Sequence, residues 1–191
     1  NGGVTVLSWA PTWQQILGNE SGGPDSLLTE SGLSPRYVKA LDRVADFLLD
    51  LKTDSNSHIP VVVQMYDCPD TRKSFSAGTY IELWRRSVDY LRNEKDVHHV
   101  LYAYSMNDVE TETDLNRYYP GNDYVDIVGL SLYQDFETDK SGILYEQRLE
   151  KGLSAVCRFA QNNKKLPALT GTGSKGVKIS NFFSGILDPV I

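Results

Sequence analysis

Carboxylates gather directly after two apolar runs of the chain. Asp67 and Asp70 follow residues 59–66, and a second acidic cluster follows residues 100–105. The members of the second cluster are Asp108, Glu110, Glu112 and Asp114. Paired carboxyl groups can perform acid–base catalysis, and clustered ones can bind a cation. Asp67 and Asp70 lie in a proline-containing loop, however, which is typical of a turn. The second cluster does not match a calcium-loop spacing, so we interpret it as a solvated loop and helix start.

The histidines and cysteines add no further predicted chemistry. The three histidines, His58, His98 and His99, precede apolar runs and predict neither a metal cluster nor a catalytic triad. Cys68 has no neighbouring histidine to act as its base. Cys157 is expected on the apolar face of a helix, buried in the protein core. We therefore expect no metal and no cofactor.

Five short apolar runs rich in β-branched residues predict the strands that position these groups. They are Val4–Trp9, Ile59–Tyr66, Val100–Ser105, Val125–Leu132 and Pro167–Thr170. Each run is apolar almost throughout and does not alternate with polar residues, which indicates strands covered on both faces, as in parallel sheets.

Amphipathic helices are predicted between these strands. Ser34 can cap the first helix, with Pro35 at its first position. Further helices are predicted to open at Thr79, to cover Thr113–Tyr118 and Tyr145–Asn162, and to begin at Ile179. The predicted loops that follow the strands cover residues 10–32, 67–78, 106–114 and 134–144. A site is expected there, because parallel α/β folds build their sites at the carboxyl ends of the strands.

Alternating strands and helices predict a parallel α/β fold. The order is compatible with a doubly wound sheet or with five of the eight units of a (β/α)8 barrel. No glycine-rich phosphate loop follows Val4–Trp9, which argues against nucleotide binding. The 191 residues carry a net charge of −6, which argues against nucleic acid as a partner, and contain no apolar run long enough for a membrane span.

An ordered set of segments resembles glycoside hydrolase family 26, the β-mannanase family of retaining (β/α)8 enzymes. The segments are Gly3–Trp9, Ile59–Val61, Tyr80–Arg92, Val97–Ser105, Tyr118–Leu130, Tyr133–Gln134 and Leu166–Thr170. The resemblance implies a partial barrel in which the predicted strands are roughly the third to the seventh of eight. We therefore expect residues 1–191 to form a single incomplete barrel domain that lacks the first two strands and the eighth.

The resemblance also locates the positions of the two catalytic carboxyl groups. The family's Leu-Thr-Glu-Thr-Gly motif corresponds to residues 169–173, so Gly171 stands at the nucleophile position. An ungapped count from Ile59 places Cys68 at the acid/base position, and a gapped one places Gln64 there. Neither alignment leaves a carboxylate, so no catalytic residue is intact.

Aromatic side chains are expected to bind sugar in the cleft that the family uses. The predicted substrate-binding residues are Trp9, Tyr66, Asp67 and Tyr133, where Asp67 takes the place of a family histidine and Tyr133 matches a tyrosine that hydrogen-bonds the nucleophile. The sequence thus predicts a β-mannanase-like domain that binds β-mannan-type polysaccharide or oligosaccharide as an inactive pseudoenzyme. The alternative is an active retaining endo-β-1,4-mannanase that uses substitute carboxylates.

The family resemblance carries two further expectations. It implies a secreted, periplasmic or cell-surface location, although the chain contains no signal peptide. Five strands cannot close a barrel built for eight, so the outer strands would be open edges, and the uncharged Val4–Trp9 edge is expected to allow self-association.

Overall fold

The computed structural model describes residues 4–9, 24–66 and 76–191. The chain divides into two compact units, each described by itself below: unit 1 comprises Asn1–Ala103 with Tyr118–Asp126, and unit 2 comprises Tyr104–Arg117 with Ile127–Ile191. Whether residues 1–191 act as a single domain stays a prediction. None of the helices in the described ranges is long and apolar enough to cross a membrane.

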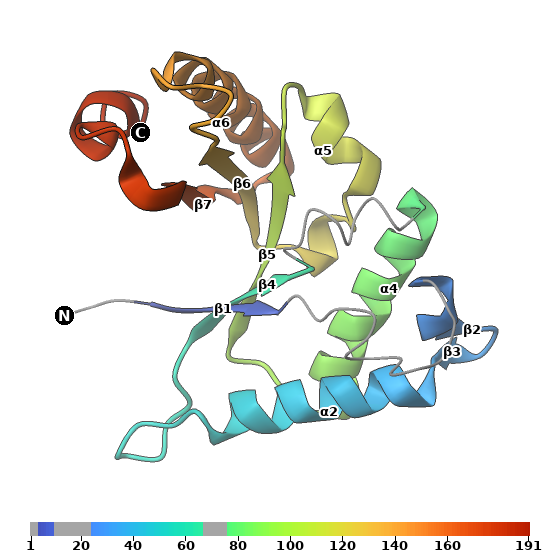
Figure 1. Ribbon diagram of the computed structural model, residues 1–191. Helices are drawn as coiled ribbons and strands as arrows, with labels where there is room; N and C mark the ends of the chain where they lie inside the picture. The colour runs from blue at the N-terminus through green and yellow to red at the C-terminus, as the bar shows by residue number, and fades with distance from the viewer. Residues whose placement is uncertain (1–3, 10–23, 67–75) are drawn as a thin grey trace. The chain divides into compact units, whose positions relative to one another are not determined.

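The five predicted strands form one sheet in sequential order, β1-β4-β5-β6-β7 (Figure 1). Their bounds are β1 Thr5–Trp9, β4 Val61–Met65, β5 Val100–Asn107, β6 Ile127–Gln134 and β7 Leu166–Ser174. The pairs β1/β4, β4/β5 and β6/β7 are parallel. A doubly wound sheet would reverse its strand order, so the sequential order selects the barrel topology. The prediction of a partial (β/α)8 barrel is confirmed.

The helices of unit 1 begin at serine caps. In α2 (Pro35–Asp50), the Ser34 side chain accepts a hydrogen bond from the Tyr37 amide at 3.4 Å, as predicted. In α4 (Ala77–Asp89), Ser76 caps the helix by accepting from the Thr79 amide at 3.1 Å, so the helix starts two residues before the predicted Thr79. The π-helix η2 (Tyr90–Glu94) continues α4, and the short 3-10 helix η3 (Asn122–Tyr124) also belongs to unit 1.

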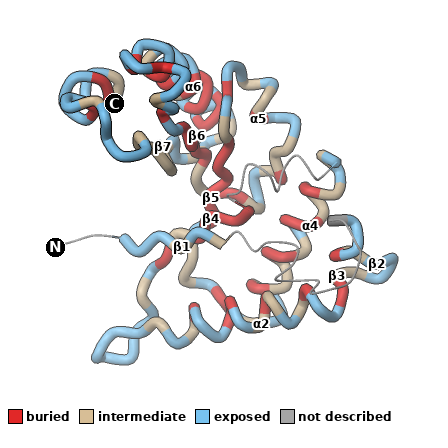
Figure 2. Tube along the Cα trace, in the orientation of Figure 1, coloured by how far each residue is buried: buried red, intermediate tan, exposed pale blue. Residues whose placement is uncertain are grey.

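Unit 2 contains most of α5 (Glu112–Tyr118), all of α6 (Ile143–Asn163), the 3-10 helix η4 (Lys175–Val177) and the π-helix η5 (Phe182–Leu187). Burial runs almost continuously along β6 and returns at helical spacing along α6 (Figure 2). The prediction that Cys157 lies in the core is wrong, because the residue is exposed. The buried stripe of α6 passes through Leu149, Val156 and Phe159 instead, one position away from the cysteine.

One short region departs from the predicted loop over residues 10–32. Its described part contains the 3-10 helix η1 (Pro24–Leu27) and a small antiparallel pair, β2 (Leu28–Thr29) with β3 (Gly32–Leu33). Strands of two residues are too short to give a periodic pattern, so the sequence offered no signal for them.

Candidate functional site

The carboxyl ends of β6 and β7 meet within unit 2 and bring two predicted site residues, Gly171 and Tyr133, together. The two strands run in register up to Leu130 and Leu169, after which Ser131 pairs with Gly171 and Tyr133 with Gly173. Thr170 is therefore an extra residue in β7, as in a β-bulge. Strand alternation places Ser131 and Tyr133 on the opposite face of β6 from Leu130 and Leu132.

The bulged Thr170 joins β5 to β7 through a hydroxyl network. Its Oγ1 donates to the Leu130 carbonyl at 2.9 Å and lies 2.6 Å from the Ser105 Oγ. Because the single proton of Thr170 is used in the first bond, Ser105 donates the second. A Cβ at Gly129 would lie 2.3 Å from the Thr170 Cγ2, so the glycine is needed for this side chain to cross the strand.

Gly171, at the position that the family resemblance assigns to the nucleophile, lies close to two side-chain hydroxyl groups. A Cβ built there would lie 2.6 Å from the Ser131 Oγ and 2.9 Å from the Tyr133 Oη. Its φ angle is not in the left-handed region, so the backbone itself would accept another residue. The two neighbouring hydroxyl groups, and not backbone strain, therefore occupy the space that a carboxylate side chain would need.

Tyr133 presents an aromatic ring at the end of β6. The residue is 62% exposed, and its Cδ1 and Cε1 atoms would each lie 3.6 Å from a Cβ at Gly173. The ring thus lies beside two glycines of β7, Gly171 and Gly173, which have no side chains to cover it. An exposed aromatic face beside hydroxyl groups can pack against the C–H face of a sugar ring while the hydroxyls bond its polar edge.

Gln64 lies in β4 of unit 1, where it pairs in register with Ser8 of β1 and Ala103 of β5. The residue is 2% exposed, and its Nε2 has no hydrogen-bond partner among the described residues. A primary amide does not ionise near neutral pH, so Gln64 cannot replace a general acid/base carboxyl group.

Trp9 and Tyr66 lie in an aromatic cluster of unit 1. The Trp9 ring is half-buried, with its centroid 5.8 Å from those of both Tyr37 and Tyr66. Tyr66 is 2% exposed, and its hydroxyl contacts the Tyr37 hydroxyl and lies 3.0 Å from the Ser87 Oγ. Burial raises the pKa of Tyr66 well above its ordinary value. Tyr66 is therefore a neutral core residue and not part of an open surface.

Asp67 and Cys68 lie outside the described residues, so their predicted roles remain predictions. The interpretation of the second acidic cluster can be examined directly. Three of its members pair with basic residues along α6: Asp108 with Arg148, Glu110 with Lys151 at 2.7 Å, and Glu112 with Arg158 at 3.3 Å.

Asp114 completes the start of α5 as a capping residue. Its Oδ2 accepts from the amides of Thr111 at 2.8 Å and Glu110 at 3.1 Å. Burial opposes the ionisation of this carboxyl group, but these hydrogen bonds outweigh it and hold its pKa below the ordinary value. Within the described ranges, no three residues among histidine, cysteine, aspartate and glutamate form a group that could hold a metal ion.

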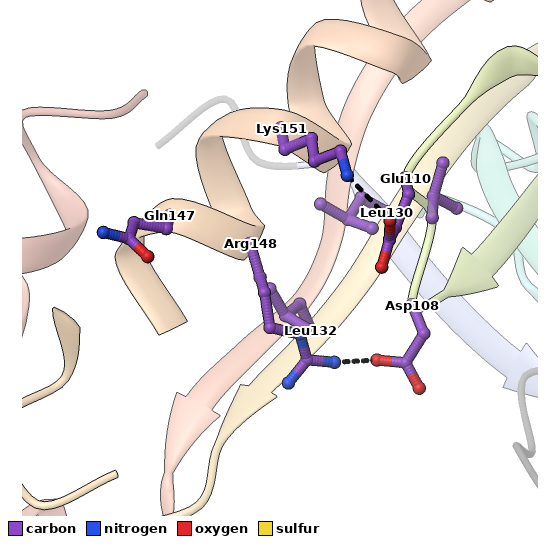
Figure 3. Close-up of a pocket in the computed structure, with 8 residues that line it drawn as sticks. Asp108, Glu110, Leu130, Leu132, Gln147, Arg148 and Lys151 are labelled. Atoms are coloured by element: carbon purple, nitrogen blue, oxygen red, sulfur yellow. Dashed lines mark hydrogen bonds and ion pairs between the residues drawn. The ribbon is translucent and has the colours of Figure 1, made fainter. Parts of the chain in front are cut away.

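A cavity of about 240 Å³ lies in unit 2, between α6 and the connection from β5 to α5 (Figure 3). Its lining residues are Asp108, Val109, Glu110, Leu130, Leu132, Gln147, Arg148 and Lys151. Leu130 and Leu132 belong to the opposite face of β6 from Ser131 and Tyr133, so this cavity is separate from the candidate sugar site.

The sequence did not single out Ser105 or Thr170, and it gave Ser131 no role. The glycines at 129, 171 and 173 were the available signal, since they mark places where neighbouring side chains approach the backbone. The bulge that sets the register beyond Leu130 has no counterpart in the hydrophobic pattern.

Comparisons with known proteins agree with this architecture. The model of the family described as glycosyl hydrolase family 26 matches residues 25–184. A mannan endo-1,4-beta-mannosidase from Bifidobacterium adolescentis is 31% identical over 160 residues, which cover 78% of this chain and 16% of the relative.

Solved structures of this family share the fold. A GH26 β-mannanase from Bacteroides ovatus is 29% identical, with a TM-score of 0.78 over all of this chain and 57% of its own. A modular endo-β-1,4-mannanase from Cellulomonas fimi is 27% identical, with a TM-score of 0.76 over 92% of this chain and 41% of its own. The chain thus spans little more than half of these relatives at most. With the family model covering most of its residues, the chain belongs to glycosyl hydrolase family 26.

Proposed function

We propose that this family 26 chain binds β-mannan-type polysaccharide without hydrolysing it. The observation that carries the proposal is Gly171, whose missing side chain is replaced in space by the hydroxyl groups of Ser131 and Tyr133. A retaining glycosidase needs a nucleophilic carboxylate and a second carboxyl group about 5–5.5 Å away. Glycine cannot form the covalent glycosyl intermediate, and losing a nucleophile lowers the rate by many powers of ten.

The acid/base position supports the same proposal. Under the gapped alignment it is Gln64, a buried amide that cannot transfer a proton at neutral pH. Under the ungapped alignment it is Cys68, which is no carboxylate either. The chain would therefore be a pseudoenzyme that keeps the family's barrel architecture.

Tyr133 is the principal sugar-binding residue of this proposal. Its exposed ring offers a flat apolar face, and its phenolic hydroxyl can hydrogen-bond to a sugar. Within unit 1, Trp9 is a separate candidate for stacking on sugar: its ring is half-buried, and its centroid lies 5.8 Å from that of the buried Tyr66. With few polar groups to satisfy the sugar hydroxyls, we expect millimolar binding, or about −4 kcal/mol.

The ligand class and the strand edges extend the proposal. Because a polysaccharide lies outside the cell, we propose that the protein is secreted, periplasmic or held at the cell surface.

The β1 edge carries no charge, and Val4 and Val6 are 63% and 60% exposed. An uncharged, exposed edge strand favours pairing with another chain, so we propose weak self-association through it.

Hydrolysis is tested by reducing-sugar release from β-1,4-mannan at high protein concentration. We expect no release above a buffer blank, and reproducible turnover would overturn the inactive assignment in favour of substitute carboxylates.

Binding is tested by calorimetry and NMR titration with a β-1,4-manno-oligosaccharide. Tyr133→Ala should abolish the signal, whereas Phe47→Ala, which removes another exposed aromatic ring from α2, should leave it unchanged. No heat and no NMR shift with the unaltered chain would contradict sugar binding.

A further inference from the structure

The cavity beside α6 has an apolar floor and a polar rim of four charged residues with Gln147. Leu130 and Leu132 of β6, with Val109, form the floor, and these residues are 1%, 4% and 3% exposed. Two ion pairs form the rim by joining α6 to the β5–α5 connection, one between Arg148 and Asp108 and the other between Lys151 and Glu110 (Figure 3). The cavity therefore combines a small apolar surface with two positively charged donors and two negatively charged acceptors.

The packing of α6 explains why a hollow forms at this place. Gly152 lets the helix approach the sheet closely, because a Cβ there would lie 2.9 Å from the Leu130 Cδ2 and 3.0 Å from the Val109 carbonyl oxygen. Arg148, one turn earlier, and Lys151, directly before Gly152, extend to Asp108 and Glu110 and do not cover Leu130 and Leu132, which line the cavity (Figure 3).

The charge balance indicates an uncharged ligand. Each guanidinium, ammonium and carboxylate has hydrogen-bonding capacity beyond its one ion pair. A neutral polyhydroxy ligand can use these spare donors and acceptors while both pairs stay intact. A charged ligand would meet both signs of charge on the rim, so its attraction to one member of each pair is offset by repulsion from the other.

The size and shape of the cavity narrow the ligand further. Pockets for drug-sized ligands run from about 300 to 1,000 Å³, so a cavity of about 240 Å³ suits a single ring-sized unit. A pyranose ring has an apolar C–H face that suits the leucine floor and a hydroxyl edge that suits the rim. The charged side chains that would bond it are exposed, at 54% for Arg148 and 58% for Lys151, so they are within reach of a ligand from solvent.

From these features we infer that the cavity is a second carbohydrate-binding site, which takes one neutral pyranose unit of the polysaccharide. The inference rests on the proposed function for its ligand class. Because the cavity lies on the opposite face of β6 from Tyr133, it would act independently of the first site and give the chain two points of attachment to a polymer, which raises its avidity.

The test is an NMR titration of the full chain with β-1,4-mannotriose, which follows the methyl groups of Leu130 and Leu132 and the ring of Tyr133 separately. We expect the leucine methyls to shift in the unaltered chain. Arg148→Met keeps an unbranched apolar stem but removes the guanidinium, so it should weaken binding at the leucine signals about tenfold. Arg158→Met is the matched control, because Arg158 forms the same kind of exposed ion pair from the same helix but does not line the cavity.

The outcomes separate this inference from the proposed function. Shifts at Tyr133 without shifts at Leu130 and Leu132 would overturn the second site and keep sugar binding at the first. Shifts at neither place would overturn both. Equal weakening by Arg148→Met and Arg158→Met would show a general effect on α6 and would also overturn the second site.

Discussion

Tyr66 and Tyr133 both lie at the carboxyl end of a strand of the same sheet, β4 for Tyr66 and β6 for Tyr133, yet their rings have opposite surroundings. Tyr66 comes directly after β4 in unit 1, is 2% exposed and shares hydroxyl contacts with Tyr37 and Ser87. Tyr133 lies near the end of β6 in unit 2, is 62% exposed and borders two glycines. The difference shows that an aromatic residue at a strand end is not by itself evidence of a binding surface.

The backbone and the facing residues explain the difference. Tyr66 has a φ of 55°, a left-handed conformation that is unusual for a large side chain and ends the strand alternation. Its ring then packs with Tyr80 and Trp84 of α4, at centroid distances of 5.8 and 5.9 Å. Tyr133 keeps the strand alternation and faces glycines, which offer no side chain to cover it.

The largest expected effect is on stability, and it tests this comparison directly. Tyr66→Ala removes a buried ring and should lower the free energy of unfolding by about 3–5 kcal/mol. Tyr133→Ala should change it by no more than about 0.5 kcal/mol, because the ring is mostly in solvent. Urea unfolding monitored by circular dichroism measures both. Similar losses in the two variants would contradict the assignment of Tyr66 to the core and Tyr133 to the surface.

A matched variant separates the ring of Tyr66 from its hydroxyl. In Tyr66→Phe the ring remains, and the Tyr37 hydroxyl can still bond the Ser87 Oγ, which lies 3.0 Å away. We therefore expect a loss of only about 1 kcal/mol. A loss as large as that of the alanine variant would show that the hydroxyl network, and not ring packing, stabilises this end of β4.

The second prediction concerns the glycines beneath Tyr133. Gly171→Glu brings a Cβ within 3 Å of two hydroxyl oxygens, so it should destabilise the fold by about 1–3 kcal/mol and should not create glycosidase activity. Gly173→Ala is the control, because its Cβ would meet Tyr133 at an ordinary contact distance of 3.6 Å. Thermal unfolding and the reducing-sugar assay measure the two effects. Hydrolysis by Gly171→Glu alone would show that an acid/base group is present, and would contradict its assignment to Gln64 or Cys68.

The sequence predicted the strands, their order and most helix starts, because these follow from local signals. The mostly apolar run of Ile59–Tyr66 and the Ser34-Pro35 cap are such signals, and each led to the observed element. What the chain pattern could predict was therefore the fold. The assignment of Gly171 to the nucleophile position rests on the family motif and stays a prediction.

The surroundings of the site residues could not be predicted in the same way. The bulge at Thr170 changes which β7 residue faces Ser131, and a shift of one residue reverses every side chain beyond it. The left-handed turn at Tyr66 sends a predicted sugar-binding ring into the core. The bulge at Thr170 and the left-handed conformation of Tyr66 both depend on contacts with other elements, so no local sequence pattern predicts them.

The end of β5 is a third strand end to compare with those of β4 and β6, and a substitution there has the smallest expected effect on stability. Here the chain leaves the strand through Asp108, whose φ is 53°, and then enters α5 through the Asp114 cap. The pKa of Asp114 is lowered in the folded chain, so its carboxylate stabilises the fold above its unfolded pKa, near 3.8, and this contribution disappears as the pH falls through the folded value. Asp114→Asn should therefore cost about 0.5–1 kcal/mol at pH 6, at the low end because the group is partly exposed, and almost nothing well below pH 3.8. Urea unfolding of both proteins across this range measures the difference. If the difference in unfolding free energy between the two proteins stays constant with pH, Asp114 acts through its shape and not through its charge. The end of β5 would then be fixed by packing, as the end of β4 is.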